Sequence, residues 1–154
     1  MIAQKTFFAD KQNTKREWLL VDATGLLFRR LCNRVSVIVR CTHKPTYSPH
    51  SDAGDYVIIV NAGKAIFTGK KMTDKYYFRY SGYVGGDKFT QAKEAMQKNP
   101  AWVVEHAIKG MLPKNSLGRE MFKKLKVYKN AEHPHEAQKP RKMDIKGKAN
   151  YLWQ

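Results

Sequence analysis

The stretch DYVIIVN at residues 55–61 decides how this chain folds, because its apolar run is nearly continuous and rich in β-branched residues. Such a run is typical of a strand that is covered on both of its faces. The preceding residues 42–54 contain Pro45 and Pro49, and their composition predicts a loop. We therefore expect a buried strand that follows an irregular segment.

A helix and a second strand precede that loop. Apolar residues recur at helical spacing, and they are Leu27, Leu31, Val35 and Ile38. Residues 17–22, EWLLVD, form a short apolar run that a turn at 22–25 closes. Strand, helix, loop and strand together make a βαβ unit, which implies a parallel pair of strands. The pattern indicates an α/β fold class.

Charge is the outstanding feature of the composition, since 29 Lys and Arg residues against 13 Asp and Glu give the 154-residue chain a net charge of +16. Residues 1–80 and 81–154 each contribute +8, from 14 minus 6 and 15 minus 7. A compact body with this excess repels itself unless a polyanion is near, so nucleic acid is the expected partner. Residues 109–129 hold seven bases against Glu120 alone, which indicates a phosphate-binding surface, with a solvated helix face as the alternative.

An aromatic strand is predicted at residues 75–80, KYYFRY. On a strand, Lys75, Tyr77 and Arg79 share one face. We predict that this face meets RNA, with charges for phosphate and a ring for sugar or base. Phe78, on the opposite face, is expected in the core.

Helical patterns follow the aromatic strand. Residues 82–86, GYVGG, predict a flexible turn, and residues 89–97 predict a helix that ends before Pro100. Asn99 and Pro100 supply an N-cap and a favoured first residue for the next helix. Gly110 is expected to end that helix in the left-handed conformation.

The last predicted elements are a helix at residues 116–124 and a strand at 125–129. Beyond them the periodicity is lost, and residues 131–154 are predicted to form an extended basic C-terminal tail that orders on contact with its partner. Residues 1–130 are expected to form a single α/β domain, with an N-terminal extension at residues 1–16.

Several classes of protein are disfavoured by the same sequence. No apolar stretch approaches the roughly 20 residues that a membrane span needs. The chain begins at Met1 without a secretory or Arg- and Ser-rich leader, so a bacterial cytoplasm is expected rather than secretion or an organelle. Cys32 and Cys41 stand nine positions apart without a CxxC pattern, which argues against a disulfide scaffold or a zinc ribbon.

Three short patterns invite a catalytic or ligand-binding interpretation, and each has a simpler alternative. GKAIFTGKK at residues 63–71 fails the Walker pattern because five residues separate its glycines, so a basic turn is expected. His133 and His135 lie near no cysteine, and hydrogen bonds to phosphate or ribose are favoured over a metal. Asp52 and Asp55 could form a catalytic or magnesium pair in an RNA-modifying enzyme, but turn-forming aspartates are favoured. No catalytic residue, metal or cofactor is assigned.

Motifs spread along the chain resemble one known family. They are VDATG (21–25), HK (43–44), YSPHSDAGDYVIIVNA (47–62), TGKK (68–71), GYVGG (82–86), IKGMLPKNSLGREMFKKLKVY (108–128) and HPHEAQKP (133–140). In this order they resemble bacterial-type ribosomal protein thirteen of the large subunit, over residues 5–145. The resemblance implies a three-layer α/β/α fold on a four-stranded, mainly parallel sheet.

The resemblance also implies which residues bind RNA. Carried over by position, the basic signature of the family falls on Arg30, Arg40, His43, Lys44, His50, Lys70, Lys75, Lys109, Lys114, Arg119, Lys124 and Lys126. Reasoning from the residues themselves adds Arg34, Lys71, Tyr77, Arg79, Lys123, His133 and His135.

The function that the resemblance implies is structural and non-catalytic. Such a constituent of the large ribosomal subunit binds large-subunit rRNA early in assembly, beside neighbouring ribosomal proteins. A translational repressor that binds messenger RNA with the same basic surface is the alternative.

Overall fold

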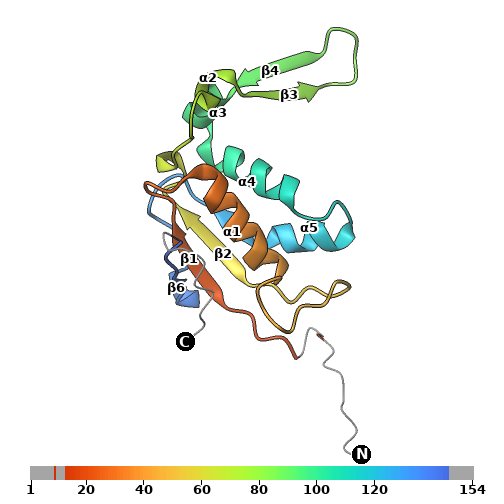
Figure 1. Cartoon of the computed structure of the whole chain (residues 1–154), viewed down its shortest axis with the longest axis vertical. Helices are drawn as coiled ribbons and strands as arrows, with labels where there is room; N and C mark the ends of the chain where they lie inside the picture. The colour runs from red at the N-terminus through yellow and green to blue at the C-terminus, as the bar shows by residue number, and fades with distance from the viewer. Residues whose placement is uncertain (1–8, 10–12, 146–154) are drawn as a thin grey trace, which may run out of the picture.

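The computed structural model describes residue 9 and residues 13–145, and four parallel strands form the central sheet of this part in the order β5-β2-β1-β6 (Figure 1). β1 (Trp18–Asp22) lies beside β2 (Tyr56–Val60), and β5 (Leu125–Val127) pairs with the other side of β2. The strands predicted at residues 17–22 and 55–61, and their parallel pairing, are confirmed. The strand predicted at residues 125–129 is present but ends at Val127. The outer parts of both predicted extensions, residues 1–8 and 146–154, lie outside the described residues.

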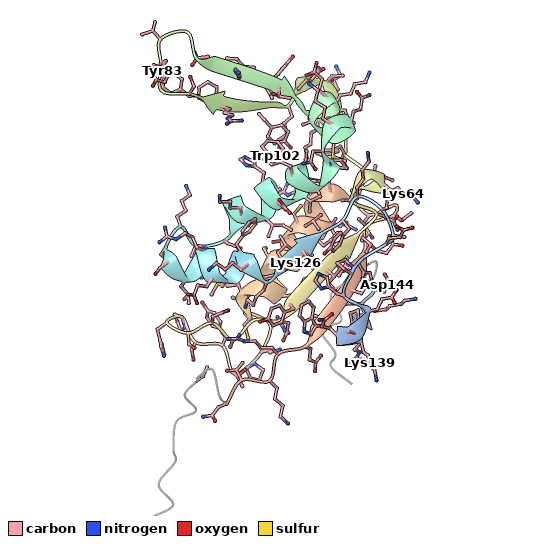
Figure 2. The ribbon with its side chains drawn as sticks, turned by 180° about the vertical axis from the view of Figure 1, so that it is seen from behind. Lys64, Tyr83, Trp102, Lys126, Lys139 and Asp144 are labelled. Atoms are coloured by element: carbon pink, nitrogen blue, oxygen red, sulfur yellow. The ribbon has the colours of Figure 1, made fainter. Side chains whose placement is uncertain are left out.

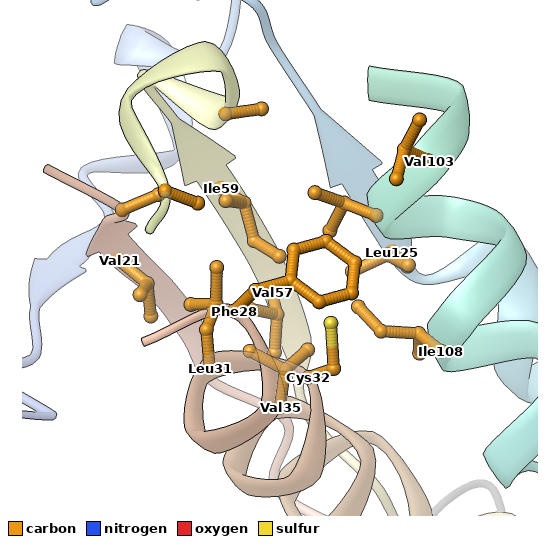
Figure 3. Packing of buried hydrophobic residues seen from close by; sticks show 14 of the residues in the cluster. Val21, Phe28, Leu31, Cys32, Val35, Val57, Ile59, Val103, Ile108 and Leu125 are labelled. Carbon is orange, nitrogen blue, oxygen red and sulfur yellow. The ribbon is translucent and has the colours of Figure 1, made fainter. Parts of the chain in front are cut away.

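Helices cover one face of this sheet. They are α1 (Phe28–Arg40), α4 (Pro100–Met111) and α5 (Ser116–Lys123). Leu31 from α1 and Ile108 from α4 are fully buried with Val57 of β2 in one apolar core (Figure 3). The helical spacing predicted around Leu31 is therefore confirmed, and its apolar stripe faces the sheet.

The predicted start of α4 is confirmed, whereas its predicted end is wrong. The side chain of Asn99 accepts a hydrogen bond from the main-chain nitrogen of Trp102 at 3.1 Å, and Pro100 opens the helix. Gly110 lies inside α4, and Leu112 caps the helix by donating its main-chain N–H to Ile108. Continued packing of the apolar stripe through Ile108 outweighs the preference of glycine for a helix end.

The three-layer expectation holds only in part. The connections from β1 to β2 and from β2 to β5 both step toward the same edge of the sheet, and right-handed connections then place their helices on one side. On the opposite face, the rings of Trp18 and Tyr56 stack with centroids 4.4 Å apart. The chain after β5 covers them, because the ring of His135 lies 5.3 Å from that of Trp18. A short 3-10 turn, η2 (Glu136–Gln138), follows His135.

β6 (Arg141–Lys142), the fourth strand of the sheet, comes from the segment predicted as a tail. It pairs in parallel with β1, and Met143 and Ile145 pack against the core. Residues 141–145, which lie in the segment predicted as a tail, therefore pack against the folded body in the structure. A strand that joins a sheet through main-chain groups needs no apolar pattern, so these residues give no signal in the sequence.

A two-stranded hairpin stands apart from the parallel sheet, and Figure 1 shows it extending away from the body. β3 (Tyr76–Tyr80) pairs antiparallel with β4 (Asp87–Gln91), and the predicted glycine-rich turn joins them. The strand predicted at residues 75–80 is confirmed. The helix predicted from residue 89 begins only at Ala92, because the residues before it pair with β3. The remaining elements are η1 (Ala62–Lys64), α2 (Lys71–Asp74) and α3 (Ala92–Lys98).

Candidate nucleic-acid interface

The orientation of α5 follows from its cap and its buried side. The side chain of Asn115 accepts a hydrogen bond from the main-chain nitrogen of Gly118 at 2.8 Å and so starts the helix. Gly118 and Met121 are buried. Arg119 and Lys123, one helical turn apart, are exposed on the other side of the helix.

The end of α4 and the outer side of α5 together form a cationic surface. Lys109 places its Nζ 5.8 Å from the ring centroid of Phe122 on α5, which brings the two helices together. The exposed residues Lys109, Lys114, Arg119 and Lys123 are called the helix surface below. Within residues 109–129 only Glu120 opposes their charge, so this surface attracts polyanions.

Lys126 is exposed but lies apart from the helix surface. It follows the buried Leu125 on β5, and neighbouring residues of a strand point to opposite faces. Lys126 therefore lies on the face of the sheet opposite the helices, as the view from behind shows (Figure 2).

A second set of cations borders a groove between α1 and the segment that leads to α2. The groove is lined by Arg29, Arg30, Lys71 and Lys75, and an adjoining hollow by Lys70, Lys71 and Lys75. Stacking of Phe28 on Phe67, with centroids 4.4 Å apart, joins the two segments. We call these five cations the α1–α2 cluster. Ala107 and Met111 of α4 also line the groove, so α4 links the cluster to the helix surface.

Lys124, which the sequence predicts to bind RNA, is buried in the structure. Only 4% of it is exposed, and its Nζ lies 2.5 Å from Asp52 Oδ1 and 3.2 Å from the carbonyl oxygen of Val39. Burial lowers the pKa of Lys124 below its ordinary value of 10.5, and the hydrogen bond and charge of Asp52 oppose that shift. The sequence spacing indicates this burial, because Lys124 comes three residues after the buried Met121, on the apolar side of α5.

His43 and Lys44 are also drawn inward, around the buried carboxylate of Asp55. Lys44 Nζ lies 2.6 Å from Asp55 Oδ1, and the main-chain nitrogen of Glu17 donates to the same oxygen at 3.0 Å. The side chain of His43 is 1% exposed, with Nε2 3.7 Å from Asp55 Oδ2. Burial lowers the pKa of His43 below 6.5. These two predicted RNA-binding residues thus hold the fold around Asp55.

The aspartates have a structural role, in agreement with the simpler interpretation of the sequence. Each carboxylate is engaged by a lysine, Asp52 by Lys124 and Asp55 by Lys44. Among the described residues, no group of three or more His, Cys, Asp or Glu side chains is arranged to hold a metal ion. We call Lys44, Asp52, Asp55 and Lys124 the buried ionic cluster.

Gly54 lies against the buried ionic cluster, at a position with no space for a side chain. A Cβ atom at this position would overlap the carbonyl oxygen of Val39 and lie 2.7 Å from Lys124 Nζ. The glycine lets the loop before β2 press against the end of α1 while Lys124 reaches between them.

Other predicted residues lie outside both cationic groups. Arg40, at the opposite end of α1 from Arg30, is exposed and donates to the hydroxyl of Tyr47 at 3.4 Å. Arg34 on α1 is half-buried, and His50 is exposed in the loop before β2.

The two tail histidines are used within the protein. His135 Nε2 lies 2.9 Å from the hydroxyl of Tyr128, and its main-chain nitrogen donates to His133 Nδ1 at 3.3 Å. Both side chains are half-buried. They help to cover the sheet, a role that spacing in the sequence does not indicate.

The two faces of the aromatic strand are the reverse of the prediction. Tyr77 is 9% exposed, and its ring contacts Trp102 and His106 of α4 at centroid distances of 5.3 and 5.7 Å. Phe78, which was expected in the core, is 60% exposed. The hairpin lies above α4 rather than in the parallel sheet, so α4 buries the face that carries Tyr77. Arg79, farther out on that face, is exposed.

Known proteins resemble this chain over nearly its whole length. None of the helices in the described residues is long and apolar enough to cross a bilayer. A family model described as "Ribosomal protein L13" matches residues 16–134. "Large ribosomal subunit protein uL13" of Caldanaerobacter subterraneus subsp. tengcongensis is 52% identical over 141 residues, covering 92% of this chain and 99% of the relative.

Further relatives of the same description come from other bacteria. The one from Symbiobacterium thermophilum is 54% identical over 141 residues, covering 92% of this chain and 99% of its own length. The one from Stenotrophomonas maltophilia is 49% identical over 140 residues, covering 91% of this chain and 99% of the relative.

Proposed function

The chain belongs to the ribosomal protein L13 family, and from this premise we propose that it binds large-subunit rRNA and supports assembly of the large ribosomal subunit. The family is one of structural, non-enzymatic proteins of the large subunit that serve translation. The bacterial origin of the relatives supports a place in the bacterial cytoplasm, within the ribosome.

The observation that carries the proposal is the exposed helix surface. Its four cations come from α4, the following loop and α5, and they are held by a folded core rather than by a free tail. Because the fold already orders the main chain that carries these cations, binding to rRNA phosphates costs side-chain entropy but little main-chain entropy. Each phosphate that a Lys or Arg neutralises releases condensed counterions, which supplies affinity and makes it depend on salt.

The α1–α2 cluster extends this surface along α4. Arg29 and Arg30 bring guanidinium groups, which hold two phosphate oxygens at once, whereas Lys70, Lys71 and Lys75 act as point charges. Two cationic groups on one rigid body fit a folded RNA whose helices approach from more than one direction. Shape and unpaired bases would give specificity, because the major groove of A-form RNA is too narrow to read.

Sedimentation tests this proposal with the intact chain. We expect the protein to sediment with the large ribosomal particle in low salt and to bind purified large-subunit rRNA more tightly than a length-matched messenger RNA. Preference for the messenger RNA of its own operon, without sedimentation at the particle, would favour the translational repressor instead.

A further inference from the structure

One face of the β3–β4 hairpin is built from aromatic rings that the fold does not use. In the antiparallel register Phe78 lies directly opposite Phe89, with ring centroids 5.1 Å apart. Tyr76 and Tyr80, two positions on either side of Phe78, share its face. These four rings, called the aromatic face, are between 54% and 66% exposed.

The aromatic face points away from the body of the protein. The opposite face carries Tyr77, whose ring packs on Trp102 and His106 of α4. Figure 2 shows the hairpin reaching beyond α4, with Tyr83 in its outer turn. The hairpin is therefore anchored at its base through Tyr77, while the four rings of the aromatic face stay exposed. Exposed apolar patches of this kind mark interaction sites.

The charges of the hairpin indicate an anionic partner. Arg79 and Lys88 lie directly opposite each other on the two strands. Two like charges in this position destabilise a free hairpin, and a polyanion removes the repulsion. Within residues 75–91 the balance is +2, because Lys75, Arg79 and Lys88 outnumber Asp87 by three to one.

The aromatic character of the exposed side chains further limits which kind of partner fits the aromatic face. The aromatic face has no aliphatic residue, and side chains on alternate positions of a strand are about 6.5–7 Å apart. Flat rings at this spacing suit unpaired bases that stack one by one. Arg79 and Lys88 lie on the other face of the hairpin, so their long side chains would meet the phosphates of such a strand from the hairpin edges. A protein partner with an aliphatic groove would leave the opposed pair of Arg79 and Lys88 without compensation.

We propose that the aromatic face binds unpaired RNA nucleotides by stacking, and that Arg79 and Lys88 bind the phosphates at the edges of the hairpin. This inference rests on the proposed rRNA-binding function and adds to it a second contact of different chemistry. The helix surface and the α1–α2 cluster bind phosphates of folded RNA, whereas the hairpin holds a segment without base pairs.

Two RNA probes separate the two contacts in the intact protein. The first is a single-stranded oligouridylate of about 12 nucleotides, within the usual site size of such proteins. The second is an RNA duplex of about the same length. Affinity for each is measured by fluorescence anisotropy over a range of salt concentrations.

Substitutions on the aromatic face should affect only the single strand. We expect Phe78→Ala with Phe89→Ala to weaken oligouridylate binding by about tenfold or more, with the salt slope unchanged and duplex binding unaltered. Phe78→Tyr with Phe89→Tyr is the matched control, because it keeps both rings and should keep the affinity. Arg79→Ala with Lys88→Ala should flatten the salt slope for the single strand.

Other outcomes would overturn the inference. Wild-type affinity of the double alanine variant for oligouridylate would do so, as would an equal loss in the tyrosine variant. A change in the oligomeric state of the free protein, without an effect on RNA binding, would instead assign the aromatic face to a second copy of the chain. Failure of the proposed rRNA-binding function would give a different result. In that case Arg119→Ala with Lys123→Ala would leave the affinity for the RNA duplex unchanged.

Discussion

Lys124 Nζ lies 2.5 Å from Asp52 Oδ1, and this ion pair joins two residues that stand 72 positions apart in the chain. The same ammonium group donates to the carbonyl oxygen of Val39 near the end of α1. Three segments thus meet at one buried lysine: α1, the loop before β2 and the junction of α5 with β5. The neighbouring Lys123 has the same chemistry but faces solvent.

This contrast predicts unequal effects on stability at the two adjacent lysines. Lys124→Met should lower the free energy of unfolding by about 3 kcal/mol, because it leaves the carboxylate of Asp52 without its partner. Lys123→Met should change it by less than about 0.5 kcal/mol. Urea unfolding followed by circular dichroism measures both, and equal losses would contradict the burial of Lys124.

Of these two adjacent lysines, only Lys123 should contribute to RNA binding. Lys123→Ala is expected to reduce the salt slope of rRNA binding by roughly one unit, since one phosphate contact is lost from the helix surface. Lys98→Ala, which removes an exposed lysine from α3, is the control for the change in net charge. An identical slope in wild type and Lys123→Ala would count against the helix surface.

Gly54 should be intolerant of even the smallest side chain. Gly54→Ala is expected to lower the free energy of unfolding by about 3 kcal/mol, because the new Cβ would overlap the main chain at Val39. At Gly63 a Cβ would meet only Pro100, 3.7 Å away, so Gly63→Ala should cost little or nothing. Similar unfolding midpoints for the two variants would show that the loop before β2 has room to move.

The burial of His43 predicts that the protein loses stability in mild acid. Its pKa is lowered in the folded protein by burial, so below its ordinary pKa of 6.5 the unfolded chain binds more protons than the folded one. The free energy of unfolding should therefore be highest above pH 6.5 and fall as the pH drops below it. His43→Gln should flatten this fall, which urea unfolding at a series of pH values between about 5 and 8 measures.

The reversed faces of β3 can be checked by two neighbouring substitutions. Tyr77→Ala should lower the free energy of unfolding by about 3 kcal/mol, since it removes a buried ring from its contacts with Trp102 and His106. Phe78→Ala should stay within about 0.5 kcal/mol. Thermal unfolding of both variants measures these changes. A larger loss of stability in Phe78→Ala than in Tyr77→Ala would support the prediction from sequence that Phe78 lies in the core.

The inner strands and α1 were predictable because their buried positions are occupied by apolar residues in a regular pattern. Ile58 and Ile59 are both fully buried, since β2 is covered on both faces and therefore lacks alternation. The family, the cationic character and the helix surface could likewise be predicted from the motifs and the charge.

The faces of the hairpin were not predictable, because alternation tells which residues share a face but not which face is covered. Tyr77 is buried only because α4 lies beneath it, and that position depends on tertiary packing. The burial of Lys124 was not predictable for a different reason. Within a run of cations its identity matches that of Lys123, and only its distance from Met121 along the helix separates the two.

The outer strands of the parallel sheet also bear on how newly made chains behave before they find a ribosome. β5 spans three residues, and β6 spans two, both of them cationic. A short outer strand gives another chain few main-chain groups to pair with, and like charges oppose the approach of a second β6. Aggregation through edge-to-edge pairing is thereby discouraged while the protein accumulates during synthesis.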